Sequence, residues 1–121
     1  MLYTEKQRNE IERVREVFSE LLKQSPNYEL LWSDKVGFVW LEIGLNPLYV
    51  DTAMRIESAA DLCREFLENV VTDVLFMTGN DHALENADPL ELVEIKQRWQ
   101  KYIDQLPEYA YLCDELLNKQ K

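Results

Sequence analysis

The spacing of apolar residues changes twice along the chain, first from a helical repeat to an alternating one and then back. Before Gln24 the apolar residues recur every three or four positions, which is typical of one face of a helix. From Tyr28 to Glu57 they follow the two-residue repeat of a strand, and from Ser58 the helical spacing returns. These changes predict an α+β fold in which extended chain lies between helices that share one apolar interior.

The first helix is predicted to begin after Thr4 and to end near Gln24. Thr4 and Gln7 have the spacing of a capping box, and the proline at position 26 cannot continue a helix. Residues of the predicted buried face share the three-and-four spacing: Ile11, Val14, Phe18 and Leu21. The segment thus predicts an amphipathic helix with one face to bury.

A three-stranded antiparallel meander is predicted over about residues 28–57. The stretches 28–32 and 36–43 are rich in β-branched and aromatic residues and are joined by the polar turn Ser33-Asp34-Lys35, as in a hairpin. The second strand is apolar at both parities, which predicts a central strand covered on each face. Residues 48–56 alternate strictly, which predicts a third strand nearer the edge of the sheet.

Three further helices are predicted in the rest of the chain, at about residues 58–78, 89–106 and 108–118. Ser58 is expected to cap the first of them, and Asp88 followed by Pro89 is a typical start for the second. Pro107 is expected to end that helix. A chain of 121 residues fits a single domain, 1–121, because two halves of about 60 residues would each have a marginal core.

The chain is strongly acidic, with a formal net charge of −10. No Lys or Arg occurs between Gly79 and Glu94. Because lysine and arginine supply most of the affinity for phosphate backbones, direct binding to nucleic acid or to an anionic membrane is disfavoured, whereas a basic protein partner is favoured. No apolar run approaches the roughly 20 residues of a membrane span, and the amino terminus lacks the order of a secretory signal, so we expect a cytoplasmic protein.

The sole histidine, His82, lies among the carboxylates of Asp81, Glu85 and Asp88. If this segment forms a helical turn, His82 and Glu85 share one face and could hold a divalent ion with Asp81 or Asp88. The alternative is a solvated acidic loop, and the spacing does not match a calcium-binding EF-hand loop. The sequence contains no phosphate-binding loop, dinucleotide fingerprint or nucleophile elbow, so we expect neither a cofactor nor catalysis.

Aromatic side chains gather toward the carboxyl end, where Trp99, Tyr102 and Tyr111 are candidates for partner binding. Trp99 and Tyr102 lie on the predicted apolar stripe, so core packing is the alternative for both. Tyr111 falls outside the face formed by Leu112 and Leu116, which makes it the better surface candidate. Glu91 and Glu94, in the segment without basic residues, are the acidic candidates for the same contact.

Three functions remain open at this point. We favour a non-catalytic protein–protein interaction module, such as an adaptor, regulator or subunit. The first alternative is an acidic mimic that occupies a nucleic-acid-binding protein, and the second is a metal-dependent enzyme built on His82. A homodimer is favoured over a monomer because the apolar stripe on residues 59–77 is unusually wide. Cys63 and Cys113 are expected to be buried free thiols that behave as small apolar side chains.

Overall fold

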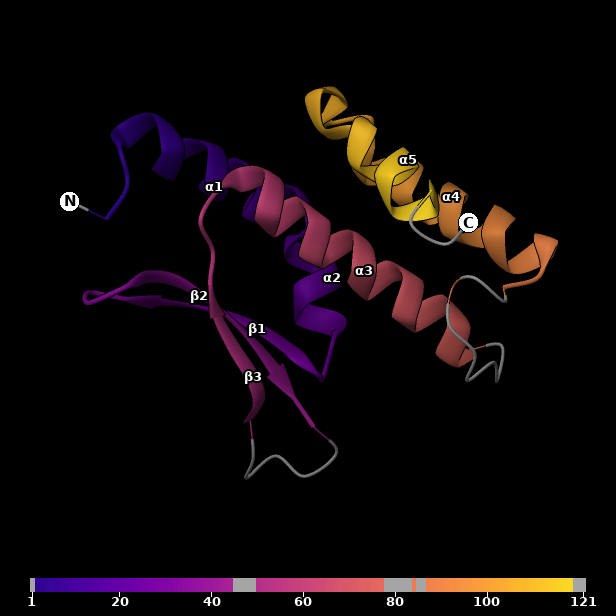
Figure 1. Ribbon diagram of the computed structural model, residues 1–121, viewed down its shortest axis with the longest axis horizontal. Helices are drawn as coiled ribbons and strands as arrows, with labels where there is room; N and C mark the ends of the chain where they lie inside the picture. The colour runs from indigo at the N-terminus through magenta and orange to yellow at the C-terminus, as the bar shows by residue number, and fades with distance from the viewer. Residues whose placement is uncertain (1, 45–49, 78–83, 85–86, 119–121) are drawn as a thin grey trace. The chain divides into compact units, whose positions relative to one another are not determined.

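The predicted order of helices and strands is confirmed in the computed structural model, which describes residues 2–44, 50–77, 84 and 87–118 (Figure 1). The fold is α+β. Backbone proximity divides the chain into two compact units, Met1–Leu62 and Cys63–Lys121, and the boundary falls within one long helix, α3 (Ala59–Met77). The expectation of a single domain stays a prediction.

The first unit begins with two consecutive helices, α1 (Glu5–Val17) and α2 (Ser19–Gln24). The predicted capping box is confirmed: the Thr4 hydroxyl accepts from the Gln7 amide, and the Gln7 side chain accepts from the Thr4 amide. A single helix to Gln24 was predicted, but Phe18 interrupts it with φ −96° and ψ 12°. Because Phe18 still donates to the Val14 carbonyl and accepts from the Leu22 amide, the interruption is confined to one residue.

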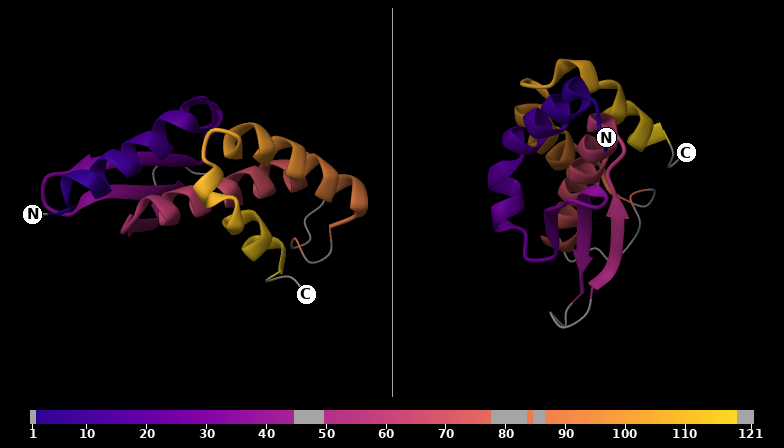
Figure 2. Two further views of the ribbon diagram at one scale, coloured as in Figure 1. Left: turned by 90° about the horizontal axis from the view of Figure 1, so that it is seen from above. Right: turned by 90° about the vertical axis from the view of Figure 1, so that its left-hand side faces the viewer.

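The sheet has the strand order β1-β2-β3, with β1 (Tyr28–Ser33), β2 (Gly37–Ile43) and β3 (Val50–Arg55) paired antiparallel. This confirms the meander and the edge position of the third strand. Figure 2 shows α1 lying along one face of this sheet. On β2, Phe38 and Trp40 are buried, whereas Val39, Leu41 and Ile43 are partly exposed. The prediction that β2 is covered on both faces is therefore met on one face only.

Tyr3 joins the start of the chain to the sheet. Its hydroxyl donates to the Ile56 carbonyl at 2.7 Å and accepts from the Phe38 amide at 3.0 Å. Its ring also packs beside Gly37, whose φ of 95° lies in the region that favours glycine, and a Cβ at that position would stand 2.5 Å from the ring. Glycine is thus required here both for backbone conformation and for close approach of the tyrosine.

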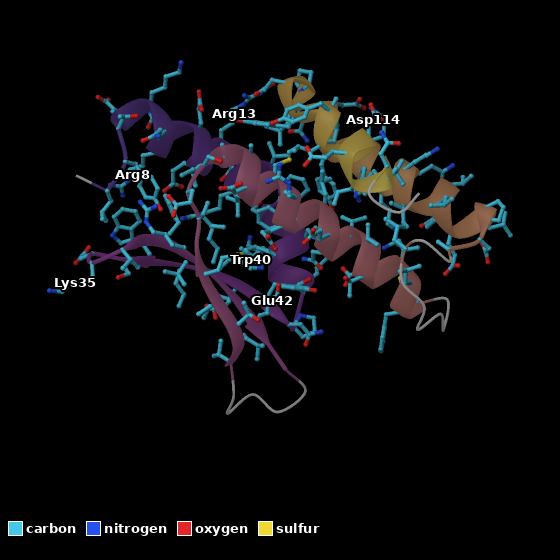
Figure 3. The ribbon with its side chains drawn as sticks, viewed as in Figure 1. Arg8, Arg13, Lys35, Trp40, Glu42 and Asp114 are labelled. Atoms are coloured by element: carbon cyan, nitrogen blue, oxygen red, sulfur yellow. The ribbon has the colours of Figure 1, made fainter. Side chains whose placement is uncertain are left out.

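Around Tyr3, aromatic and basic side chains form a cluster. The Arg8 guanidinium lies 4.3 Å from the centre of the Trp32 ring, and that ring meets Phe38 edge-on at 4.9 Å. Figure 3 marks Arg8 on α1 and shows Lys35 projecting from the hairpin turn, away from the sheet. The cluster consists of Tyr3, Arg8, Trp32 and Phe38. Because each of these side chains already contacts another of them within the first unit, we interpret the cluster as structural.

In its described part, the second unit contains helices and no strand. It contains most of α3, then α4 (Pro89–Ile103), a short 3₁₀ turn at Pro107–Tyr109 and α5 (Tyr111–Asn118). The helix predicted to reach residue 106 ends at Ile103. Leu106 has left helical conformation, with φ −134° and ψ 55°, as is favoured for the residue before a proline. The predicted last helix is divided into the 3₁₀ turn and α5.

The buried apolar side chains of the second unit come from all three helices. Along α3 they recur at the predicted helical spacing, and they include Cys63, Phe66, Leu67, Val70, Val71, Val74 and Leu75. From α4 and the segment after it come Ile95, Trp99, Ile103 and Leu106, and from α5 come Leu112 and Leu116. The predicted wide stripe of α3 is thus confirmed along most of the helix, but it ends before Phe76 and Met77, which are exposed.

Candidate functional site

Of the four predicted metal ligands, Asp81, His82 and Glu85 lie outside the described residues. Asp88 is described and is the N-cap of α4: its carboxylate accepts from the Glu91 amide at 2.9 Å. In the described ranges 2–44, 50–77 and 87–118, no group of three or more His, Cys, Asp or Glu side chains is arranged to hold a metal ion. The metal site therefore stays a prediction.

The five predicted partner contacts divide between interior and surface. Tyr111 is 53% exposed, whereas Trp99 is buried and donates from its indole N–H to the Leu67 carbonyl at 3.1 Å. Tyr102 is partly buried, with the Lys101 ammonium 5.1 Å from the centre of its ring. Glu91 is buried because its side chain completes the α4 capping box by accepting from the Asp88 amide, and Glu94 is partly exposed.

A groove of about 380 Å³ lies where α3 ends and α4 begins, within the second unit. Its lining combines apolar and charged side chains: Val74, Met77, Asp88, Leu90, Glu91, Glu94 and Arg98. We call it the α3–α4 groove. It brings together two of the predicted partner contacts, Glu91 and Glu94, with Asp88 from the predicted metal set. It does not include Trp99, Tyr102 or Tyr111.

Large apolar side chains are exposed at the same two helix ends. Phe76 is 85% exposed, Leu90 is 81% exposed and Met77 is 67% exposed, and Val93 is half-exposed one turn after Leu90. We call these four residues the exposed apolar set. Two of them, Met77 and Leu90, line the α3–α4 groove, and apolar side chains exposed in a groove with a polar rim are typical of a binding site.

The charges of the α3–α4 groove are unbalanced toward the negative. Among the described residues that line the groove, Arg98 is the one cation, and its guanidinium donates to the Glu94 carboxylate at 2.8 Å and to the Met77 sulfur at 3.4 Å. Burial raises the pKa of the nearby Asp73 carboxyl, and the positive charge of Arg98 opposes this rise. Asp88, Glu91 and Glu94 carry three formal negative charges against the one positive charge of Arg98, so the described lining has a formal net charge of −2.

Sequence reasoning missed most of this groove. Met77 satisfies the helical repeat of α3 and was therefore assigned to the buried face, while Leu90 and Phe76 carried no pattern of their own. The burial of Glu91 had a signal: Asp88 and Glu91 have capping-box spacing, in which the glutamate side chain turns back onto the backbone.

Both cysteines are free thiols in the second unit. Cys63 on α3 is buried as predicted, whereas Cys113 on α5 is only partly buried, which corrects the prediction for that residue. Burial raises the pKa of the Cys63 thiol to about 12, with a smaller contribution from the Cys113 sulfur. Burial is also the main cause that raises the pKa of the Cys113 thiol to about 11, helped by the Asp114 carboxylate. Both thiols are therefore mainly protonated near neutral pH, and the thiolate is the reactive form.

We therefore expect the native protein to react slowly with a thiol reagent. At about pH 8 a thiol of pKa 11 is ionised to only about one part in a thousand, so its alkylation is expected to be roughly 100-fold slower than that of an ordinary cysteine. The rate is expected to rise about tenfold for each unit of pH, since the thiolate fraction does. The measurement is the time course of iodoacetamide labelling, read by mass spectrometry, with the denatured chain as the control. Labelling of Cys113 as fast in the native as in the denatured protein would contradict this expectation.

Comparisons with protein-family models, with curated proteins and with solved structures found no match to this chain. Across the described ranges, none of the helices is both long and apolar enough to cross a bilayer.

Proposed function

We propose that this protein is a non-catalytic interaction module that binds a protein partner through the α3–α4 groove and the exposed apolar set. The observation that carries the proposal is the exposure of Met77 and Leu90 in a groove lined by carboxylates, with Phe76 exposed next to Met77 in the chain. In water, each of these side chains forgoes the roughly 1.5–3 kcal/mol that full burial of a large apolar side chain contributes. A partner that covers them supplies that stabilisation on binding.

The expected partner is basic, because the groove is acidic and the whole chain carries a net charge of −10. We propose the cytoplasm as its location, since reducing conditions there maintain free thiols such as Cys63 and Cys113. The homodimer remains a prediction. So do the nucleic-acid mimic and the metal-dependent enzyme, and no described contact favours either of these two functions.

The proposal is tested with serine substitutions in the exposed apolar set. The tagged protein is used to capture partners from the host cell, each captured protein is purified, and its affinity is measured by calorimetry. Phe76→Ser and Leu90→Ser are each expected to weaken binding at least about tenfold, as at a contact residue worth more than 1 kcal/mol. Both side chains are highly exposed, so the melting temperature is expected to change little.

The matched control is Val50→Ser, which removes a half-exposed apolar side chain from the first unit. It is expected to leave the affinity unchanged. If Val50→Ser weakens binding as much as Leu90→Ser, or if neither groove variant weakens it, the partner contact lies elsewhere and the proposal is wrong.

A further inference from the structure

The side chains that line the α3–α4 groove restrict the kind of ligand that it can bind. This inference rests on the proposed function, in which the groove contacts a protein partner. The groove presents apolar side chains, Met77 and Leu90, next to carboxylates, Asp88 and Glu94. A complementary ligand needs an apolar group to cover the former and a cation to meet the latter. An anionic ligand would meet uncompensated negative charge.

The start of α4 offers no competing site for an anion. The amino terminus of a helix normally attracts negative groups through its unpaired N–H groups. Here the Asp88 carboxylate accepts from the Glu91 amide, and the Glu91 carboxylate accepts from the Asp88 amide. The chain's own carboxylates therefore already take the place that an external anion would occupy.

The secondary structure of the second unit favours a helical ligand over an extended one. An extended peptide usually binds by adding a strand to an exposed sheet edge, whereas an amphipathic helix binds in an apolar groove between helices. The described part of the second unit contains helices and no strand, and the groove lies between the end of α3 and the first turns of α4. Strand addition thus has no edge to use at this site.

We infer that the α3–α4 groove binds a cationic amphipathic helix of the protein partner. Apolar side chains of that helix cover Met77 and Leu90, and its lysine or arginine side chains pair with Asp88 and Glu94. Arg98 donates to the Glu94 carboxylate at 2.8 Å and so offsets one of the three lining carboxylates, which leaves an excess of negative charge to attract the cationic helix.

The test uses three synthetic peptides of about 18 residues and the full-length chain, with binding measured by calorimetry. The first peptide has leucines at helical spacing and lysines elsewhere. The second replaces the lysines by glutamates, and the third has the composition of the first in an order that removes the apolar face. The first is expected to bind at least about tenfold more tightly than the other two, and to weaken severalfold between low and moderate salt.

Two pairs of substitutions separate local from overall charge. Asp88→Asn with Glu94→Gln removes two groove carboxylates, and asparagine preserves the helix cap. Asp104→Asn with Asp114→Asn changes the net charge by the same amount at exposed positions of the second unit that do not line the groove. We expect the groove pair to weaken binding of the leucine–lysine peptide about five- to tenfold and the control pair to leave it within twofold.

Several outcomes would overturn the inference. Equal binding of the glutamate peptide, equal binding of the peptide without an apolar face, or equal effects of the two substitution pairs would each exclude a cationic helix in this groove. Sedimentation that reveals a dimer abolished by Leu90→Ser would assign the groove to a second copy of the chain. If the leucine–lysine peptide does not bind, but Phe76→Ser and Leu90→Ser still release a captured partner, the inference is wrong and the proposed function stands.

Discussion

Replacement of Trp99 by alanine is expected to lower the free energy of unfolding by about 3 to 5 kcal/mol. The indole is 2% exposed, and its N–H donates to the Leu67 carbonyl on α3. Alanine would leave a cavity in the interior of the second unit and would remove this hydrogen bond between α4 and α3. Since small proteins are stable by only about 5 to 15 kcal/mol, the loss is a large fraction of the total. Chemical denaturation followed by circular dichroism measures it.

Two further variants locate the cause. Trp99→Phe retains most of the apolar volume and is expected to cost about 1 to 2 kcal/mol, mainly through the lost hydrogen bond. Tyr111→Ala, at an exposed aromatic residue of the same unit, is expected to cost less than about 0.5 kcal/mol. If Trp99→Ala left stability unchanged and weakened partner binding instead, the buried position of this indole would be wrong.

The second substitution with a large expected effect replaces Tyr3 by phenylalanine and so removes the tyrosine hydroxyl. Tyr3→Phe is expected to lower the free energy of unfolding by about 2 to 4 kcal/mol. The hydroxyl accepts from the Phe38 amide and donates to the Ile56 carbonyl, so phenylalanine would leave two buried backbone groups without this partner. Each group left unsatisfied costs about 1 to 3 kcal/mol, because it lost its water on folding.

Tyr111→Phe is the matched control, because it removes a hydroxyl from an exposed tyrosine. It is expected to change stability by less than about 0.5 kcal/mol. Hydrogen exchange supplies a second measurement: in Tyr3→Phe, the amide of Phe38 is expected to exchange faster than in the natural protein. Unchanged stability together with unchanged exchange at Phe38 would show that the hydroxyl does not tie the amino terminus to the sheet.

The places where prediction and structure differ have local causes. The helix predicted to reach residue 106 ends at Ile103, and Leu106, which precedes a proline, has non-helical backbone angles. The helix predicted to reach Gln24 without a break is interrupted at Phe18, although the backbone hydrogen bonds continue across it. The second strand was predicted to be covered on both faces, but it is covered on one. An apolar run alone does not reveal whether a second layer packs on the other face.

For the candidate site, the sequence supplied the carboxylates but not their grouping. Glu91 and Glu94 were expected at the partner contact and Asp88 in a metal site, whereas all three line the α3–α4 groove. Tyr111 was correctly predicted to be exposed and Trp99 to be buried. In each case the helical repeat of the residue's own helix separates the apolar face from the other positions.

The amino-acid sequence by itself determined the order of the helices and strands, the antiparallel meander and the caps at Thr4 and Asp88. These features depend on backbone hydrogen bonds and side-chain repeats over a few residues, which can be read in one dimension. Only the tertiary structure decided which apolar positions remain exposed: Val74 and Met77 belong to the same stripe of α3, yet one is buried and the other is not. Exposure depends on how far the neighbouring helices extend in space, and no local pattern carries that information.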